Sequence, residues 1–401
     1  MPDDLATIKR KQYNAHLAVM ALRRTIFERG ASARIDELIK AEERLAQLSE
    51  ERARAEKQSL AANASQAGGK LLGGATTGLD AKAELRLEYV PTALVHLFDS
   101  GNHPLVEFSI SNRKEPTKRI EVSSFVEGYS ARAVETMEII NGETKSIKQM
   151  PTFFPRQIEL VNELTRATVN VEVRDLDAKS ELHKTIPVWL VPRTTAPLSV
   201  LDPSTGQWRD LTAYFAAFVT PNAPAVMEFV RNVTDAHPKK ELVGYQIADT
   251  RVQPQVQATF DALKALGIRY VQSVIQFTRE SGAANQRVRR PAETLKDKNA
   301  NCIDSTLLMA SLLEAISLNP AIVLIPGHAF LAWETWRDGN GGSDQWKYVE
   351  TTMIGTATFE DACAEGEKKA ADWQASAKGN PDYFRRLALS DLRAQGITPL
   401  E

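Results

Sequence analysis

The residue best placed to do chemistry in this chain is Cys302, one of only two cysteines among 401 residues. The apolar residues that follow it recur at helical spacing and predict one buried helical face: Leu307, Leu308, Leu312, Leu313 and Ile316. The residues before it are polar, and Asn299 and Asn301 are suitable helix N-caps. We therefore expect Cys302 at the start of a helix and directed away from its buried face, where unpaired backbone amides and the helix dipole favour a thiolate.

A histidine and a carboxylate follow in an order that a cysteine nucleophile can use. Residues 321–326 read as a short buried strand, and 329–336 read as the next strand, with His328 at its start. A glycine-rich turn then leads to a hairpin partner over 346–353, and pairing the two strands brings Glu350 towards His328. A carboxylate on one imidazole nitrogen fixes the tautomer, so that the other nitrogen can take the thiol proton.

These residues resemble the transglutaminase-like superfamily of papain-type folds over roughly residues 255–355. The resemblance is carried by four runs: Pro291-Ala-Glu-Thr-Leu295, Asn301-Cys302, Pro326-Gly-His-Ala-Phe330 and Trp346-Lys-Tyr-Val-Glu-Thr351. The family usually has Gly-Asp-Cys or Gly-Gln-Cys, then His-Ala-Trp, then an aspartate. This chain departs from that pattern at Ala300-Asn301, at Phe330 and at Glu350. The resemblance implies a papain-like α+β domain of bacterial type and a cysteine-nucleophile amide hydrolase, most simply a peptidase, that needs no metal or cofactor.

In this reading Cys302, His328 and Glu350 form a catalytic triad, and a protein or peptide is the substrate. The backbone amide of Cys302 and one further donor stabilise the oxyanion of the tetrahedral intermediate. The sequence does not choose among four candidates for that further donor: Gln272, Gln276, Gln286 and Asn301. Three arginines just upstream form either a solvated basic turn or a dock for a substrate carboxylate: Arg287, Arg289 and Arg290.

Other interpretations of the same residues stay open. A lone cysteine is often a small buried hydrophobe, and a histidine beside an apolar strand is often a satisfied core residue. The second cysteine, Cys363, lies in an apparently amphipathic helical stretch and reads as structural. An acyl-enzyme that met an amine instead of water would make the protein an acyl-transferring transglutaminase. The remaining alternative is a non-catalytic interaction or adaptor protein that keeps the fold.

The fold class is α+β, and the chain reads as four segments. Residues 1–60 predict a helical arm, either a helical hairpin or a short coiled coil, and 61–81 predict a flexible Gly/Ala-rich linker. Short alternating strands over 82–218 predict an antiparallel β-sandwich, and 219–401 form the transglutaminase-like catalytic domain. The arm either packs on its own chain or offers a surface for a protein partner or for self-association.

Composition bounds the remaining function classes. A net charge of −2 gives no argument for nucleic acid or an anionic membrane as partner, and no apolar run has the length of a membrane span. The start Met-Pro-Asp-Asp lacks the charged and apolar regions of a signal peptide. Two cysteines in different contexts predict neither a disulfide framework nor a metal site. We therefore expect a reducing, cytoplasmic compartment, and the Ala- and Arg-rich composition is typical of a bacterial protein.

Overall fold

The structure is a computed structural model of mixed α+β architecture with several sheets. It describes residues 7–8, 10–12, 14–15, 18–19, 21–22, 37–45, 47–48, 51, 70–71, 78–87, 89–113, 117–178, 180–202, 207–246, 252–271, 285–338, 341–342 and 345–400. The chain divides into two compact units. The first unit comprises residues 1–12, 47–210 and 401, and the second comprises 13–46 and 211–400.

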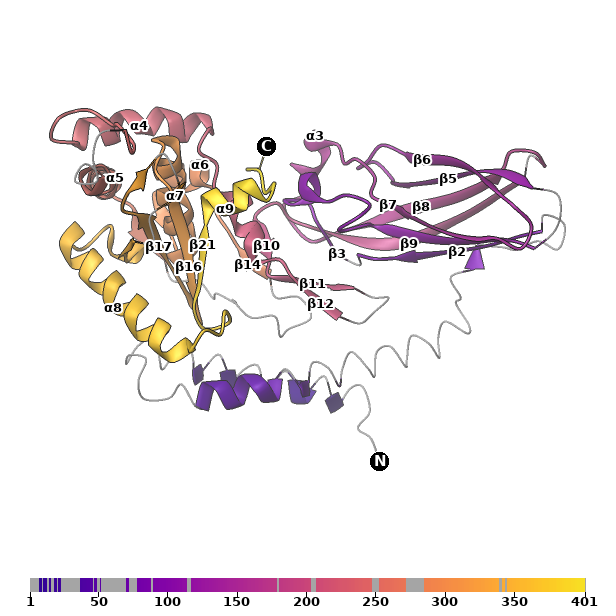
Figure 1. Ribbon diagram of the computed structural model, residues 1–401, viewed down its shortest axis with the longest axis horizontal. Coiled ribbons are helices and arrows are strands. Elements are labelled where there is room, and N and C mark those ends of the chain that lie inside the picture. Colours follow the sequence, from indigo (N-terminus) through magenta and orange to yellow (C-terminus); the bar gives the residue numbers. More distant parts are fainter. Residues whose placement is uncertain are drawn as a thin grey trace. The chain divides into compact units, whose positions relative to one another are not determined.

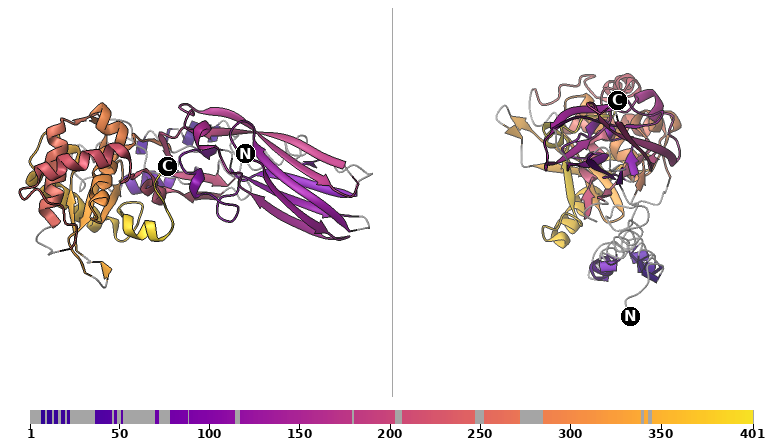
Figure 2. Two further views of the ribbon diagram at one scale, coloured as in Figure 1. Left: turned by 90° about the horizontal axis from the view of Figure 1, so that it is seen from above. Right: turned by 90° about the vertical axis from the view of Figure 1, so that its right-hand side faces the viewer.

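The first unit contains a four-stranded sheet and a five-stranded sheet (Figures 1 and 2). The four-stranded sheet has the order β1-β2-β4-β7, with β1 (Lys70–Leu71), β2 (Leu79–Leu85), β4 (Val106–Asn112) and β7 (Thr144–Gln149). The five-stranded sheet has the order β3-β9-β8-β5-β6, with β3 (Tyr89–Pro91), β9 (Ser180–Val191), β8 (Thr165–Asp175), β5 (Lys118–Val126) and β6 (Ala133–Ile139). Smaller elements complete the unit: η2 (Val95–Leu97), α3 (Pro155–Ile158), β10 (Thr195–Pro197), β11 (Ser199–Asp202) and β12 (Gln207–Asp210).

Alternating side chains hold these two sheets face to face. Val106, Phe108 and Ile110 alternate along β4 and are fully buried, as expected for a strand with one face in the core. Polar side chains also join the sheets: Asn112 Nδ2 donates to the Ile139 carbonyl at 3.1 Å, and Gln149 Nε2 donates to the Val122 carbonyl at 3.1 Å. One pairing differs from the all-antiparallel prediction, because β3 runs parallel to β9.

The strands β1 and β2 and the division between the two units lie near the predicted segment boundaries. β1, and the first residues of β2, lie inside the segment 61–81 that the sequence predicts as a linker; the remaining residues of that segment are outside the described part, apart from Gly78. β1 pairs with β2 through Lys70↔Lys82 and Leu71↔Ala81. The two units divide between Asp210 and Leu211, whereas the predicted boundary lies at residue 218.

The second unit is built around a four-stranded sheet with the order β20-β17-β16-β21 (Figure 1). Its strands are antiparallel: β20 (Trp346–Val349), β17 (His328–Glu334), β16 (Pro320–Ile325) and β21 (Arg385–Ala388). Its helices are η3 (Thr212–Phe218), α4 (Pro224–Ala236), α5 (Val252–Leu266), α6 (Pro291–Asp297), α7 (Cys302–Ala315), η5 (Thr351–Met353), α8 (Phe359–Ala377) and α9 (Leu389–Ala394). Short strands complete it: β13 (Arg269–Tyr270), β14 (Asn285–Arg287), β15 (Asn299–Ala300), β18 (Arg337–Asp338) and β19 (Gly341–Gly342).

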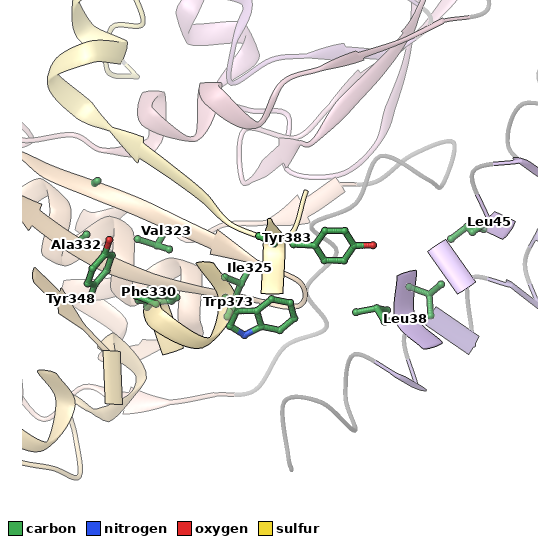
Figure 3. Close-up of a cluster of buried hydrophobic side chains, with 13 residues drawn as sticks. Leu38, Leu45, Val323, Ile325, Phe330, Ala332, Tyr348, Trp373 and Tyr383 are labelled. Carbon is green, nitrogen blue, oxygen red and sulfur yellow. The ribbon is translucent and has the colours of Figure 1, made fainter. Parts of the chain in front are cut away.

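Both faces of this sheet are covered, since every residue of β16 and β17 is buried. Alternate residues of the two strands join an apolar cluster with Ala370, Trp373 and Ala377 of α8 and with Tyr383. Figure 3 shows this cluster. Leu38 and Leu45 of the helical stretch 37–45 belong to the same cluster. The arm therefore contributes buried side chains to the core of the second unit.

Helix α7 is buried on every side, which corrects the prediction of a helix with one buried face. All its residues from Cys302 to Leu313 are buried. The sequence pattern misleads because the opposite face is also apolar or small, with Ile303 and Ala310, and the helix packs against α4, α5 and α6 as well as against β16 and β17. A helix that is apolar all round is a core helix rather than an amphipathic one. None of the described helices has both the length and the apolar character needed to cross a bilayer.

Candidate active site

Cys302 is the first residue of α7, as the sequence predicts. Asn301 is the N-cap of this helix, and its side chain accepts a hydrogen bond from the Asp304 backbone N–H at 2.9 Å. The Asp304 carboxylate in turn accepts from the Asn301 backbone N–H at 3.2 Å. These reciprocal bonds form a capping box, which satisfies the amides at the helix start and fixes where the thiol lies.

The thiol itself differs from the expectation of an acidic, outward-facing cysteine. Cys302 is fully buried, and burial raises its pKa well above the usual value. Hydrogen bonds from the backbone N–H groups of Ala329 and Ile303 act in the opposite direction, while the charges of Glu350 and Asp304 raise the pKa further. Desolvation of a thiolate in the apolar interior outweighs the helix dipole, so Cys302 is not the acidic thiol that the sequence predicts.

His328 is held at the start of β17 by a tight turn. Ile325 pairs with His328, and the two residues between them are Pro326 and Gly327. Gly327 has φ of 77°, in the left-handed region that glycine tolerates. Proline followed by glycine is the sequence typical of a type II turn. His328 Nε2 lies 2.7 Å from Glu350 Oε2, so the predicted proximity of these two side chains is confirmed.

Glu350 sits just beyond β20, where the strand gives way to η5. Its carboxylate is almost entirely buried and is surrounded by donors. Oε1 accepts from the Thr352 backbone N–H at 3.1 Å and from the Thr352 hydroxyl at 2.7 Å. Oε2 accepts from Lys369 Nζ at 2.8 Å in addition to His328. Burial opposes ionisation of Glu350, but His328 and Lys369 outweigh it and hold the pKa of this carboxyl well below its usual value.

The start of α7 is tied directly to the segment that carries Glu350. The hydroxyl of Thr351 lies 3.1 Å from the Ser305 hydroxyl and 2.9 Å from the Thr306 hydroxyl. All three residues are buried. The thiol, the imidazole and the carboxylate therefore come from three elements whose ends are joined by hydrogen bonds.

The structure describes two of the four predicted oxyanion donors, Asn301 and Gln286. The side-chain oxygen of Asn301 is engaged in capping α7. Gln286 is fully buried on β14, and its amide donates to the Arg287 carbonyl at 2.7 Å. Gln272 and Gln276 lie outside the described residues.

Two of the upstream arginines make local ion pairs rather than a substrate dock. Arg289 donates to the buried Asp304 carboxylate from its backbone N–H at 2.8 Å and from its side chain at 3.2 Å. Arg290 pairs with Glu293, at the start of α6. The basic run thus helps to hold the capping carboxylate of the Cys302 helix.

Sequence reasoning did not identify Tyr270, which lies beside the site. Tyr270 pairs with Ala300 in the short parallel ladder of β13 and β15, and Ala300 lies two positions before Cys302. Its side chain is 43% exposed, whereas Cys302 and His328 are 0% and 1% exposed. Burial of its hydroxyl, followed by the nearby charges of Cys302 and Glu350, raises the pKa of Tyr270 to about 12. Tyr270 is therefore a partly exposed residue close enough to the buried thiol to feel its charge.

The second cysteine belongs to a separate feature. Cys363 of α8 is half-buried in the wall of a pocket of about 670 Å³, together with Trp333, Trp346 and Glu367. Burial is the main cause that raises the pKa of its thiol to about 12. Both cysteines are free. Among the described residues, no group of three or more His, Cys, Asp or Glu side chains is arranged to hold a metal ion.

No protein-family model matches the chain, and no relative was found among curated proteins.

Proposed function

We propose that the chain is a cysteine-nucleophile amide hydrolase that acts on a protein or peptide, with Cys302, His328 and Glu350 as its triad and a transglutaminase-like second unit. One observation carries the proposal. The strand start His328–Ala329 contacts both partners at once, because the His328 ring lies 2.7 Å from Glu350 and the Ala329 backbone N–H donates to the Cys302 sulfur. This is the order of nucleophile, base and orienting carboxylate that a covalent acyl-transfer mechanism needs.

The proposed mechanism begins from a neutral thiol. With its Nε2–H donated to Glu350, His328 presents the lone pair of Nδ1 as the base. Because burial raises the pKa of Cys302, we propose that the proton passes to His328 as the sulfur attacks the amide carbonyl, rather than beforehand. The imidazolium then protonates the leaving amine, and the C–N bond breaks to give a thioester. Water, activated by the neutral imidazole, hydrolyses the thioester and restores the thiol.

The oxyanion of the tetrahedral intermediate needs preorganised donors. The backbone amide of Cys302 is the first of these in our proposal. For the second we propose the Tyr270 hydroxyl, beside the candidates Gln272, Gln276, Gln286 and Asn301 that the sequence leaves open. Burial and then the charge of Cys302 raise the pKa of Tyr270, as expected for neighbouring groups.

The proposal also sets the surroundings of the enzyme. A catalytic thiol must stay reduced, so we propose a reducing compartment such as the cytoplasm. The arm is proposed to be a helical hairpin, since residues 37–45 and several shorter stretches between 7 and 48 are helical. The alternative of a non-catalytic interaction protein is favoured by one observation, the complete burial of Cys302.

Cleavage mapping separates these two functions. The full chain, Cys302→Ala, His328→Ala and Cys363→Ala are each incubated with a proteome-derived peptide mixture, and new peptide ends are read by mass spectrometry. We expect new ends with the wild type and with Cys363→Ala, and none with the other two. Peptides cut equally by all four proteins, or by none, contradict the proposal. An added primary amine that appears on the peptides in place of water indicates acyl transfer.

A further inference from the structure

Lys369 of α8 reaches the carboxylate of the proposed triad. Its Nζ lies 2.8 Å from Glu350 Oε2, the same oxygen that lies 2.7 Å from His328 Nε2. The Glu350 side chain is 1% exposed and that of Lys369 is 23% exposed. Lys369 also pairs with Glu365, one helical turn earlier, at 3.2 Å. The carboxylate is thus shared between the imidazole and a permanent cation.

We infer that Lys369 is a positioning residue of this site, the counter-ion that keeps Glu350 ionised while His328 is neutral and able to act as a base. The inference rests on the proposed function, because it concerns the same triad. It adds a fourth member, taken from a helix that lies after the triad in the sequence.

The physical reason is the cost of a buried charge. A carboxylate without a cationic partner in the interior is strongly disfavoured. If Lys369 did not neutralise Glu350, the carboxylate would either take up a proton or hold His328 as the imidazolium. In the first case the carboxylate no longer fixes the ring's tautomer. In the second case the ring has no lone pair left to accept the thiol proton.

Within the part of the chain that the structure describes, the other charged groups around the site do not replace Lys369. Tyr270 and Cys302 both feel the negative charge of Glu350, but neither supplies a positive charge. Asp304 is paired with Arg289 at the start of α7. Glu365 is an anion on the outer side of Lys369. Burial acts to lower the pKa of Lys369, but the charge of Glu350 acts to raise it, and the pKa is raised overall, as expected for a retained ion pair.

The test measures the protonation of His328 directly, so it does not depend on access to the buried thiol. Full-length protein is labelled at its six histidines, and the ring-carbon signals are followed by NMR as a function of pH. His328 is assigned by the signal that His328→Ala lacks. Lys369→Met removes the charge and keeps the stem, and Lys369→Gln removes the charge but keeps a donor. Lys369→Arg keeps the charge, and Lys368→Met alters the exposed neighbour on the same helix.

We expect the His328 titration midpoint to move to higher pH by about one unit or more in Lys369→Met and Lys369→Gln, the displacement typical of losing one close charge. Lys369→Arg and Lys368→Met are expected to titrate like the wild type. A lowered midpoint would report a protonated Glu350 and also supports the inference, whereas an unmoved midpoint in the folded Met or Gln variant overturns it, as does an Arg variant displaced as far as Met. These failures leave the triad standing, whereas peptide cleavage that persists in Cys302→Ala removes the proposed function itself.

Discussion

At the scale of single residues, the carboxylate of Glu350 determines how the site is organised. It accepts from His328, from Lys369 and twice from Thr352. In the proposed triad, these contacts let a glutamate occupy the position where the resembling family has aspartate. Glu350 is the N-cap of η5, so its side chain accepts from the Thr352 backbone N–H and also reaches the His328 ring. The Glu350 carboxylate is thus held by local backbone geometry as well as by charge.

The depressed pKa of Glu350 predicts an acid-sensitive contribution to stability. A carboxyl whose pKa is lower in the folded than in the unfolded state stabilises the fold above its unfolded value of 4.5, and this stabilisation is lost as the pH falls towards the folded value. We expect Glu350→Gln to lower the free energy of unfolding by about 3–5 kcal/mol at pH 7, because it breaks a buried ion pair.

That difference should shrink as the pH falls below 4.5, the unfolded value. Urea unfolding of both proteins at pH 7 and at lower pH measures it. Asp372→Asn, at an exposed position of α8, serves as control. A variant whose stability follows the wild-type pH dependence throughout would show that Glu350 is not the titrating group.

The sequence predicts only the part of the site that local pattern encodes. Cys302 at a helix start and His328 at a strand start follow from periodicity and turn residues, and the hairpin brings Glu350 to the ring. Lys369 and Tyr270 lie on other elements, and no spacing in the sequence marks them. The acidity expected of Cys302 was wrong, because a helix start says nothing about what packs over it.

At the scale of elements, a strand without alternation gives the sequence little by which to recognise it. β6 is exposed at most of its positions, so its residues carry no period-two pattern. The run Leu85–Val90 looks like one strand, but β2 ends at Leu85 and β3 begins at Tyr89. By contrast, β16 is a continuous apolar run and was predicted within one residue at each end. Burial on both faces leaves a signal in composition even without alternation.

Helix α8 approaches the backbone of β20 closely at Gly366. A Cβ at this position would lie 2.8 Å from the Val349 backbone nitrogen and 2.9 Å from the Tyr348 carbonyl carbon. We expect Gly366→Ala to destabilise the protein by about 1–3 kcal/mol despite the better helix propensity of alanine, because backbone must move. The shift would separate Lys369 from Glu350 and lower the cleavage rate.

Thermal unfolding and the peptide-cleavage assay measure these two effects. Ala371→Gly, at an exposed position of the same helix, is the matched control. It should lose about 1 kcal/mol of helix propensity and keep its activity. A Gly366→Ala protein that is as stable and active as the wild type would mean that α8 does not approach β20 this closely.

At the scale of the whole molecule, composition reveals segments but not how they pack. The arm reads as a separate amphipathic element, yet residues 13–46 group with the second unit and residues 1–12 with the first. Val19, Leu38 and Leu45 belong to one buried cluster with Tyr383 and Trp373. Figure 3 labels all of these except Val19. Heptad-like spacing cannot distinguish a helix that binds its own chain from one that binds a partner, because both bury the same stripe.

The two roles of the arm make opposite predictions for stability. If Leu38 and Leu45 belong to the core of the second unit, Leu38→Ala and Leu45→Ala each create a cavity and lower the free energy of unfolding by about 2–5 kcal/mol. Glu43→Ala, at an exposed position of the same helix, should leave the free energy of unfolding unchanged.

Denaturant unfolding read by tryptophan fluorescence measures the loss, and light scattering on the same samples measures the mass in solution. Leucine variants that keep wild-type stability but lose an oligomer would instead assign this stripe to self-association. Ala370 and Trp373 of the same cluster lie on α8, the helix that carries Lys369. A destabilised arm should therefore also slow peptide cleavage.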